Sequence, residues 1–301
     1  MLNNSAPERN PYFIGGIIDI QSFLLLKAGL KPVIRIGCAN YSESNLRELK
    51  QLLKGDGIQV LLGEFKGSFY NQKIKEPIYI LYFSLSLDLV RQAYEAEKTG
   101  DRQILGRLLG YPSCCVKNFI EKAGQENYGF IIYALLKSHT RPSLYCNFIF
   151  NFDSKLDNEK EKIYQKTRDI WRRTAHFFLI KHTPCSFNCQ ESIKLGEKTL
   201  KLLKKETPKL GQEIEKVLQK PVLYFDDFRW LVFDGTVKGN QLEYSRVLSY
   251  QSLFPKEKLD LIKAGNRLVV CDKRISVFKN EKLVATIGKE DKYRGALIDF
   301  G

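Results

Sequence analysis

Two pairs of cysteines are the residues of this sequence whose type and spacing could do chemistry. Cys114 and Cys115 are adjacent, and Cys185 and Cys189 lie four residues apart. Residues that favour a helix start precede each pair: Pro112, Ser113, Thr183 and Pro184. We therefore expect each pair in the first turn of a helix. There, the unpaired backbone N–H groups and the helix dipole favour the thiolate, the form that binds metals and attacks electrophiles.

The spacing of the pairs narrows the metal sites that they could form. Neither pair has the two-residue spacing of a zinc knuckle, and no CxxxCxxC triplet follows Cys189. Adjacent helical side chains diverge by about 100°, so Cys114 and Cys115 are expected not to share one zinc ion easily. A cluster of several irons tolerates that divergence better. The sequence thus favours an iron–sulfur cluster bound by Cys114, Cys115, Cys185 and Cys189.

Three alternatives for the four cysteines stay open. A single zinc could take one of the adjacent pair together with Cys185 and Cys189, and His182 could complete that site. A metal-free protein could cycle either pair between dithiol and disulfide. The cysteines could also be buried packing residues, which is the interpretation that we favour for the three isolated ones, Cys38, Cys146 and Cys271.

Other polar residues lie beside the cysteines in the sequence. His182 is three residues before Cys185, and we expect it to be a metal ligand or a catalytic acid/base group, although a structural or capping role fits equally well. Further candidates with either a site role or a capping role are Asn147, Ser186, Asn188 and Ser192.

Composition places the chain among globular proteins and predicts a cytoplasmic one. The 301 residues are 44% hydrophobic and 27% charged, and no apolar run approaches the roughly 18 residues of a membrane span. Residues 1–10 lack the features of a signal peptide, and no membrane partner is expected. In a reducing compartment seven cysteines do not form a disulfide framework, which again favours metal binding or thiol chemistry.

The positive charge concentrates around the cysteines. Residues 111–220 carry 20 basic and 12 acidic side chains, which is +8 of the net charge of +14. Such a surface attracts acidic small molecules or nucleic acid, and it also raises solubility without any binding. A row of lysines on one helix face is predicted to be an ordinary solvated surface: Lys194, Lys198, Lys201 and Lys205.

Hydrophobic periodicity predicts an α+β fold in three domains. Residues 1–105 form an α/β domain, with strands over 32–37, 57–63 and 77–85 and helices over 42–54 and 88–98, the latter closed by Gly100. A β-α-β pattern opens it, without GxGxxG or a Walker loop. Residues 106–218 form a helical domain that carries the cysteine motifs and packs on the first. Residues 219–301 form a small antiparallel β domain.

The period of the hydrophobic pattern differs between the two later domains. Helices are predicted over 114–123, 128–137, 160–179 and 190–205, with a loop over 147–157. Val116, Phe119 and Ile120 lie on one face of the first of these helices. Strands are predicted over 222–225, 229–233, 242–248, 267–271, 275–278, 282–287 and 296–300, with a hairpin at 278–282. This tail forms a sheet or a partly closed barrel.

The two cysteine motifs resemble those of an uncharacterised prokaryotic family, a so-called domain of unknown function. Its members pair Leu-Gly-Tyr-Pro-x-Cys-Cys-Val-x-x-Phe with a later His-x-Pro-Cys-Ser-x-x-Cys-x-x-Ser. The first motif matches Leu109, Gly110, Tyr111, Pro112, Cys114, Cys115, Val116 and Phe119, and the second matches His182, Pro184, Cys185, Ser186, Cys189 and Ser192. The similarity covers roughly residues 80 to 200. It implies that the two motifs act as one unit, and it implies nothing about a substrate.

These observations predict a thiolate-site protein that binds an iron–sulfur cluster or another metal. The expected activity is that of an oxidoreductase or a sulfur-chemistry enzyme acting on an acidic substrate. One rival is a non-catalytic RNA- or DNA-binding protein with a structural zinc site, in which aromatic residues of the tail stack on bases. These aromatics are Tyr224, Phe225, Phe228, Trp230 and Phe233, and at this spacing a core position is the interpretation that we favour for them. The other rival is a metal-free dithiol/disulfide redox protein.

Overall fold

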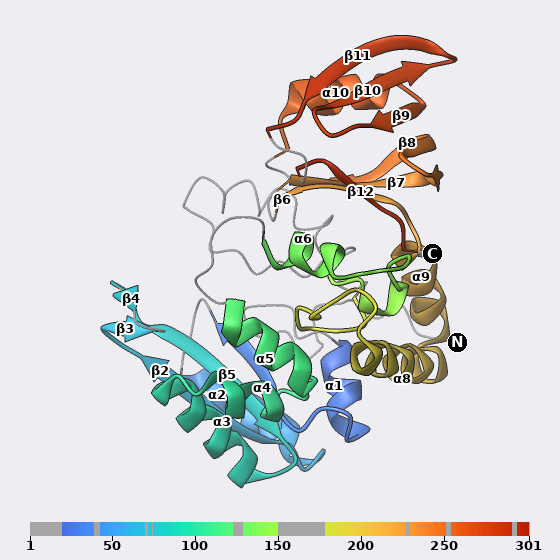
Figure 1. The fold of residues 1–301 in the computed structure, drawn as a ribbon. Helices are drawn as coiled ribbons and strands as arrows, with labels where there is room; N and C mark the ends of the chain where they lie inside the picture. Colours follow the sequence, from blue (N-terminus) through green and yellow to red (C-terminus); the bar gives the residue numbers. More distant parts are fainter. Residues whose placement is uncertain are drawn as a thin grey trace. The chain divides into compact units, whose positions relative to one another are not determined.

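The computed structural model describes most of the chain, in nine stretches. They are residues 20–38, 43–69, 72–73, 75–122, 129–149, 178–226, 229–250, 254–290 and 294–300. The chain divides into two compact units, residues 1–121 and 122–301. The chain has a small antiparallel sheet with helices, then a helical segment, then a seven-stranded antiparallel sheet, which confirms the predicted α+β class (Figure 1). The division into three domains stays a prediction.

The first unit contains a three-stranded sheet in the order β1-β5-β2. Its strands are β1 (Ile34–Cys38), β2 (Gln59–Phe65) and β5 (Ile78–Ser84). Both outer strands pair antiparallel with β5, so β1 and β2 run parallel to each other on either side of it. The expected β-α-β unit is therefore present, with helix α2 (Glu43–Lys54) as its connection and with β5 inserted between the two strands.

Alternate side chains of β5 enter two different cores because successive residues of a strand point to opposite faces. Leu81 and Phe83 lie in one core, to which α1 (Ile20–Lys27) and α2 contribute. Ile80 and Tyr82 lie in the other, to which α3 (Leu87–Thr99) and α4 (Arg102–Leu108) contribute. The central strand is thus buried on both faces, as its continuous apolar run predicts.

A buried ion pair ties α3 to this sheet. Glu97 is 3% exposed, and its carboxylate accepts two hydrogen bonds from the Arg35 guanidinium, at 2.6 and 2.8 Å. It accepts a third from the Tyr82 hydroxyl at 2.8 Å. One turn later α3 ends at Gly100 in the left-handed conformation, with φ of 74°, as predicted.

Two further elements complete the first unit. Strands β3 (Ser68–Phe69) and β4 (Gln72–Lys73) form a small two-stranded sheet of their own. Helix α5 (Ser113–Lys122) carries the first cysteine pair and starts within one residue of the predicted position. Of the three residues predicted on one face, Val116 is buried, whereas Phe119 and Ile120 are 39% and 40% exposed.

The second unit begins with helices. They are α6 (Gly129–Leu136), the 3-10 turn η2 (Leu144–Cys146), α8 (Gln190–Glu206) and α9 (Pro208–Leu218). Residues 160–177 of the helix predicted over 160–179 lie outside the described residues, and residues 178 and 179 are not helical. The loop prediction beyond residue 149 also falls outside the described residues. The lysine row of α8 is exposed, as predicted, while Leu200 and Leu203 on the same helix are buried.

Seven antiparallel strands form the sheet of the second unit, coloured orange to red in Figure 1. Their order is β11-β10-β9-β8-β7-β6-β12, so chain neighbours pair except at β12, which returns to β6. The strands are β6 (Val222–Asp226), β7 (Arg229–Lys238), β8 (Gln241–Tyr250), β9 (Arg267–Val270), β10 (Arg274–Lys279), β11 (Lys282–Gly288) and β12 (Ala296–Ile298). All seven lie at predicted positions, and helix α10 (Lys256–Ala264), which was not predicted, contributes to their core.

The predicted hairpin connects β10 and β11. Asn280 and Glu281 at its tip have positive φ angles of 47° and 69°, the backbone that a tight two-residue hairpin turn requires. Among the described residues, no helix is both long enough and apolar enough to cross a membrane.

Candidate metal centre

The first cysteine pair lies in the opening turn of α5. The Pro112 carbonyl accepts the backbone N–H groups of Cys115 and Val116, both at 3.0 Å, which starts the helix where the proline predicts. Cys114 is exposed, and Cys115 is only 2% exposed. A Cβ added to Gly106 of α4 would lie 2.6 Å from Val116, so α4 and α5 pack closely here and fix the inward side of α5.

The two sulfur atoms of this pair are closer than the helical divergence suggested. Sγ of Cys114 lies 3.9 Å from Sγ of Cys115. Two thiolates on one tetrahedral zinc, with Zn–S distances of about 2.3 Å, lie about 3.8 Å apart. The 3.9 Å between these neighbouring sulfurs is therefore compatible with both binding one ion, an arrangement that the sequence did not favour.

The second cysteine pair flanks a turn rather than lying within a helix. Helix α8 begins at Gln190, with Cys189 as its N-cap residue, and Cys185 precedes that helix in a bend. The predicted start near Pro184 is therefore wrong. Backbone groups between the cysteines are bound in a local turn, in which the Cys189 N–H donates to the Ser186 carbonyl at 3.0 Å. Cys189 is 8% exposed and Cys185 is half-buried.

Residues from the preceding helical segment hold this turn in place. The Ser138 hydroxyl donates to the Ala134 carbonyl at 2.7 Å and accepts the N–H of Phe187 at 3.0 Å. The Asn188 amide donates to the Thr140 hydroxyl at 2.6 Å. Sequence reasoning missed Ser138 and Thr140 because they lie almost 50 residues away along the chain.

Buried side chains fix the same turn from inside. Phe187 is fully buried, and its ring packs against Phe148 and Phe300, with centroid distances of 5.9 and 5.1 Å. Cys146 is also fully buried, and its thiol donates to the Cys189 carbonyl, with Sγ and O 3.8 Å apart. Burial is the main cause that raises the pKa of the Cys146 thiol, and the nearby Cys189 and Cys185 raise it further. Cys146 is therefore a neutral packing residue, as predicted.

The four predicted cysteines form one cluster. Sγ atoms of Cys114, Cys115, Cys185 and Cys189 all lie within 4.8 Å of one another. Four sulfur donors at this spacing could hold a metal, and thiolate is a ligand that zinc and iron both prefer. The donor set therefore fits the predicted class of cofactor, a thiolate-bound metal or cluster.

His182 lies beside the second pair without belonging to the cluster of ligand atoms. It is 6% exposed, and its Nε2 lies 2.9 Å from the hydroxyl oxygen of Ser192, which is fully buried on the first turn of α8. This contact links the segment before Cys185 to the helix after Cys189. The catalytic role predicted for His182 stays a prediction.

The other candidate polar residues form hydrogen bonds within the protein. The Asn147 side chain donates to the Leu218 carbonyl at 3.1 Å and accepts the Ile149 N–H at 3.3 Å, so it braces the start of a loop. Ser186 accepts the Asn188 N–H at 3.0 Å. Cys271 is exposed, so the prediction that it is buried is wrong, and nothing is described for the Cys38 side chain.

The aromatic residues of the tail do not form a stacking platform for bases. Phe225 and Phe233 lie in the core of the sheet. Four of the five predicted residues are at most 8% exposed: Tyr224, Phe225, Trp230 and Phe233. The fifth, Phe228, lies outside the described residues. The four described rings are therefore core residues, as favoured, and offer no exposed face for base stacking.

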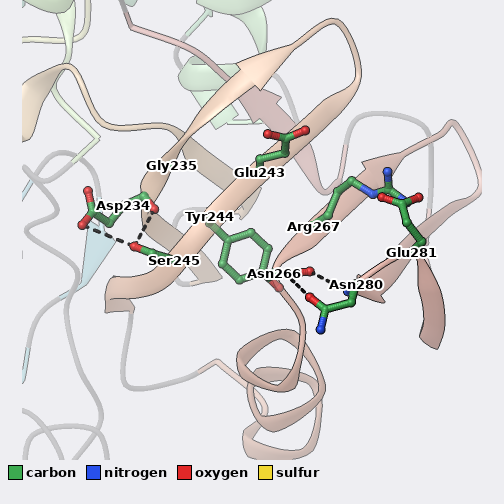
Figure 2. Close-up of a pocket in the computed structure, with 9 residues that line it drawn as sticks. All are labelled: Asp234, Gly235, Glu243, Tyr244, Ser245, Asn266, Arg267, Asn280 and Glu281. Carbon is green, nitrogen blue, oxygen red and sulfur yellow. Dashed lines mark hydrogen bonds and ion pairs between the residues drawn. The ribbon is translucent and has the colours of Figure 1, made fainter.

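A polar pocket of about 500 Å³ lies over the sheet of the second unit (Figure 2). Three of its charged groups form ion pairs: Arg267 pairs with Glu281 at 2.8 Å, and Asp234 pairs with Lys220 at 2.7 Å. Asn266 and Asn280, also in its wall, share a hydrogen bond of 3.0 Å. These contacts account for most of its polar side chains as parts of the sheet and its hairpin.

Comparison of the chain with protein-family models, with curated proteins and with solved structures finds no match. The geometry of the cysteine cluster is therefore the basis of the proposals below.

Proposed function

We propose that the four cysteines bind one metal ion as four thiolates and that this centre is the functional site of the protein. The compactness of the cluster carries the proposal, since all four Sγ atoms lie within 4.8 Å of one another. A tetrahedral ion with metal–sulfur distances of about 2.3 Å requires sulfur–sulfur distances near 3.8 Å. The 3.9 Å between Cys114 and Cys115 meets that requirement.

Zinc and iron are the two ions that best suit four thiolates. A cluster of four irons places each thiolate on a different iron, so its protein sulfurs lie farther apart than those around one ion. The short sulfur–sulfur distances therefore favour a single ion over the iron–sulfur cluster expected from the sequence. Zinc is the first choice because tetrahedral all-cysteine sites are common for it.

Four protein ligands restrict the chemistry of such a centre. They fill the tetrahedral coordination of a zinc ion, so a substrate has no open position on the metal. A reaction must then take place at a cysteine sulfur. This favours the sulfur-chemistry enzyme over the oxidoreductase among the predicted activities, with the basic segment 111–220 attracting an acidic substrate.

Metal analysis of the whole chain tests the proposal. The protein is expressed with both zinc and iron in the medium and purified without oxygen, and zinc, iron and acid-labile sulfide are then measured per chain. We expect about one ion per chain and no sulfide. Several irons with matching sulfide would establish the cluster instead, and a chain with neither metal would overturn the metal centre.

Single substitutions assign the ligands. Cys185→Ser and Cys189→Ser should each lower the bound metal to a small fraction of the wild-type content. Cys271→Ser is the matched control, because Cys271 is an exposed cysteine outside the cluster, and its metal content should equal that of the wild type. Equal metal loss in all three variants would contradict the assignment.

A further inference from the structure

We propose that Cys114 is the nucleophile of the four-cysteine centre and that its substrate is a small alkylating electrophile that reaches the sulfur from solvent. The inference deepens the proposed metal centre and rests on it. It concerns which of four chemically similar sulfurs reacts, and the structure distinguishes them by their surroundings.

Burial separates the four sulfurs. Cys114 is exposed, Cys185 is half-buried, and Cys115 and Cys189 are 2% and 8% exposed. An electrophile must approach a sulfur along the line opposite its leaving group, which needs open space beside that sulfur. Among the four, Cys114 offers that space best.

Adjacent positions on one helix produce this difference between Cys114 and Cys115. Successive residues of α5 point about 100° apart, so one side chain faces solvent while the next faces the core. Their sulfurs still lie 3.9 Å apart, close enough to bind the same ion. The pair therefore presents a reactive ligand beside an anchored one.

Metal binding supplies the activation. A thiol that binds a metal does so as the thiolate, and the thiolate is the nucleophilic form of cysteine. The first turn of α5 adds the positive end of the helix dipole, which also favours an anion. Cys114 thus combines an activated sulfur with access from solvent.

The reaction is a single displacement. The Cys114 sulfur uses an electron pair to bond the electrophilic carbon, and the bond from that carbon to the leaving group breaks. The leaving group departs with the bonding electrons as an anion, so nothing is oxidised or reduced and no proton moves. The product is a neutral thioether on Cys114, and the other three cysteines keep their thiolates.

Alkylation mapping on the metal-loaded chain tests the inference. The protein is treated with limiting iodoacetamide at pH 6, 7 and 8, and the labelled cysteines are identified by peptide mass spectrometry. Cys114 should carry the first label of the four centre cysteines. Its rate should fall by less than about threefold from pH 8 to pH 6, whereas an ordinary thiol with a pKa of about 8.5 slows roughly 75-fold.

Cys271 provides the internal reference, because it is exposed and lies outside the cluster. Labelling of Cys185 before Cys114 would overturn the inference, and so would a Cys114 rate that follows pH as Cys271 does. Cys114→Ser should abolish the pH-insensitive label and leave the Cys271 rate unchanged. A chain without bound metal contradicts the proposed centre itself, and metal analysis reveals that before any labelling.

Discussion

The two cysteine pairs reach one cluster by different means. Cys114 and Cys115 are placed by a regular helix, whose first turn alone determines that one faces solvent and the other the core. Cys185 and Cys189 are placed by a non-helical turn, which Ser138 and other residues distant in sequence hold in shape. The first pair should therefore tolerate changes around it, while the second should depend on its packing.

The largest expected effect comes from the aromatic anchor of the second pair. Phe187→Ala removes a fully buried ring from between Cys185 and Cys189, which should cost about 3–5 kcal/mol of unfolding free energy and most of the bound metal. Phe119→Ala is the matched control beside the first pair, because that ring is 39% exposed. Denaturant unfolding measures both, and equal costs would contradict the comparison.

A close approach of α8 to η2 gives the next effect. A Cβ on Gly196 would lie 2.5 Å from the Tyr145 carbonyl oxygen, next to Cys146. Gly196→Ala should therefore force α8 away and cost about 1–3 kcal/mol. Gly288→Ala is the control, since a Cβ there meets nothing within 4 Å. Thermal unfolding distinguishes them, and an unchanged melting temperature in Gly196→Ala would show that the contact relaxes freely.

The hydrogen bond between His182 and Ser192 is expected to have the next largest effect. It holds the segment before Cys185 against the helix after Cys189, at an N–O distance of 2.9 Å. Ser192→Ala should lower metal affinity by roughly 10- to 100-fold, as loss of groups that orient metal ligands does. Competition with a chelator measures it.

A threonine in the same place sharpens this test. Ser192→Thr keeps a hydroxyl and should restore most of the affinity, while Ser192→Ala should not. If the alanine variant binds metal as the wild type does, the contact only packs the helix and does not position the second pair.

Sequence alone predicted the regular elements well. Most strands and helices of the described chain lie within a few residues of their predicted positions because apolar periodicity determines them. The four cysteines were also found by type and clustering. The core positions favoured for the tail aromatics are confirmed for the four that the structure describes, because such rings are more often packed in a core than exposed.

Contacts between residues far apart in the chain could not be predicted from the sequence. The helix over 190–205 was predicted, but the turn found in place of the expected helix start at Pro184 is held by Ser138, which contacts Phe187 49 residues away along the chain. The approach of the Cys114 and Cys115 sulfurs depends on side-chain torsions, which spacing does not determine. The helix-start signal at Pro184 was outweighed by hydrogen bonds to Ser138 and Thr140, which no local sequence pattern predicts.

The smallest expected effect lies outside both pairs and shows whether the second unit is generally fragile. The Lys220 ammonium donates to Asp234 at 2.7 Å, and this hydrogen bond lowers the pKa of the Asp234 carboxyl. Since the folded-state pKa is lowered, the pair stabilises the fold above the ordinary aspartate range, and that contribution is lost as pH falls. Both side chains are about one third exposed, so Lys220→Met should cost at most about 1 kcal/mol at pH 7.

The pH series separates this ion pair from a packing effect of the lysine chain. The difference in unfolding free energy between wild type and Lys220→Met should shrink toward zero as pH falls from 7 to 3, because protonated Asp234 no longer favours the ammonium. Metal content should stay at the wild-type value throughout the neutral range. A loss of metal in this variant would mean that the second unit transmits any small destabilisation to Cys185 and Cys189, and the contrast between the two pairs would then reflect general fragility instead of local packing.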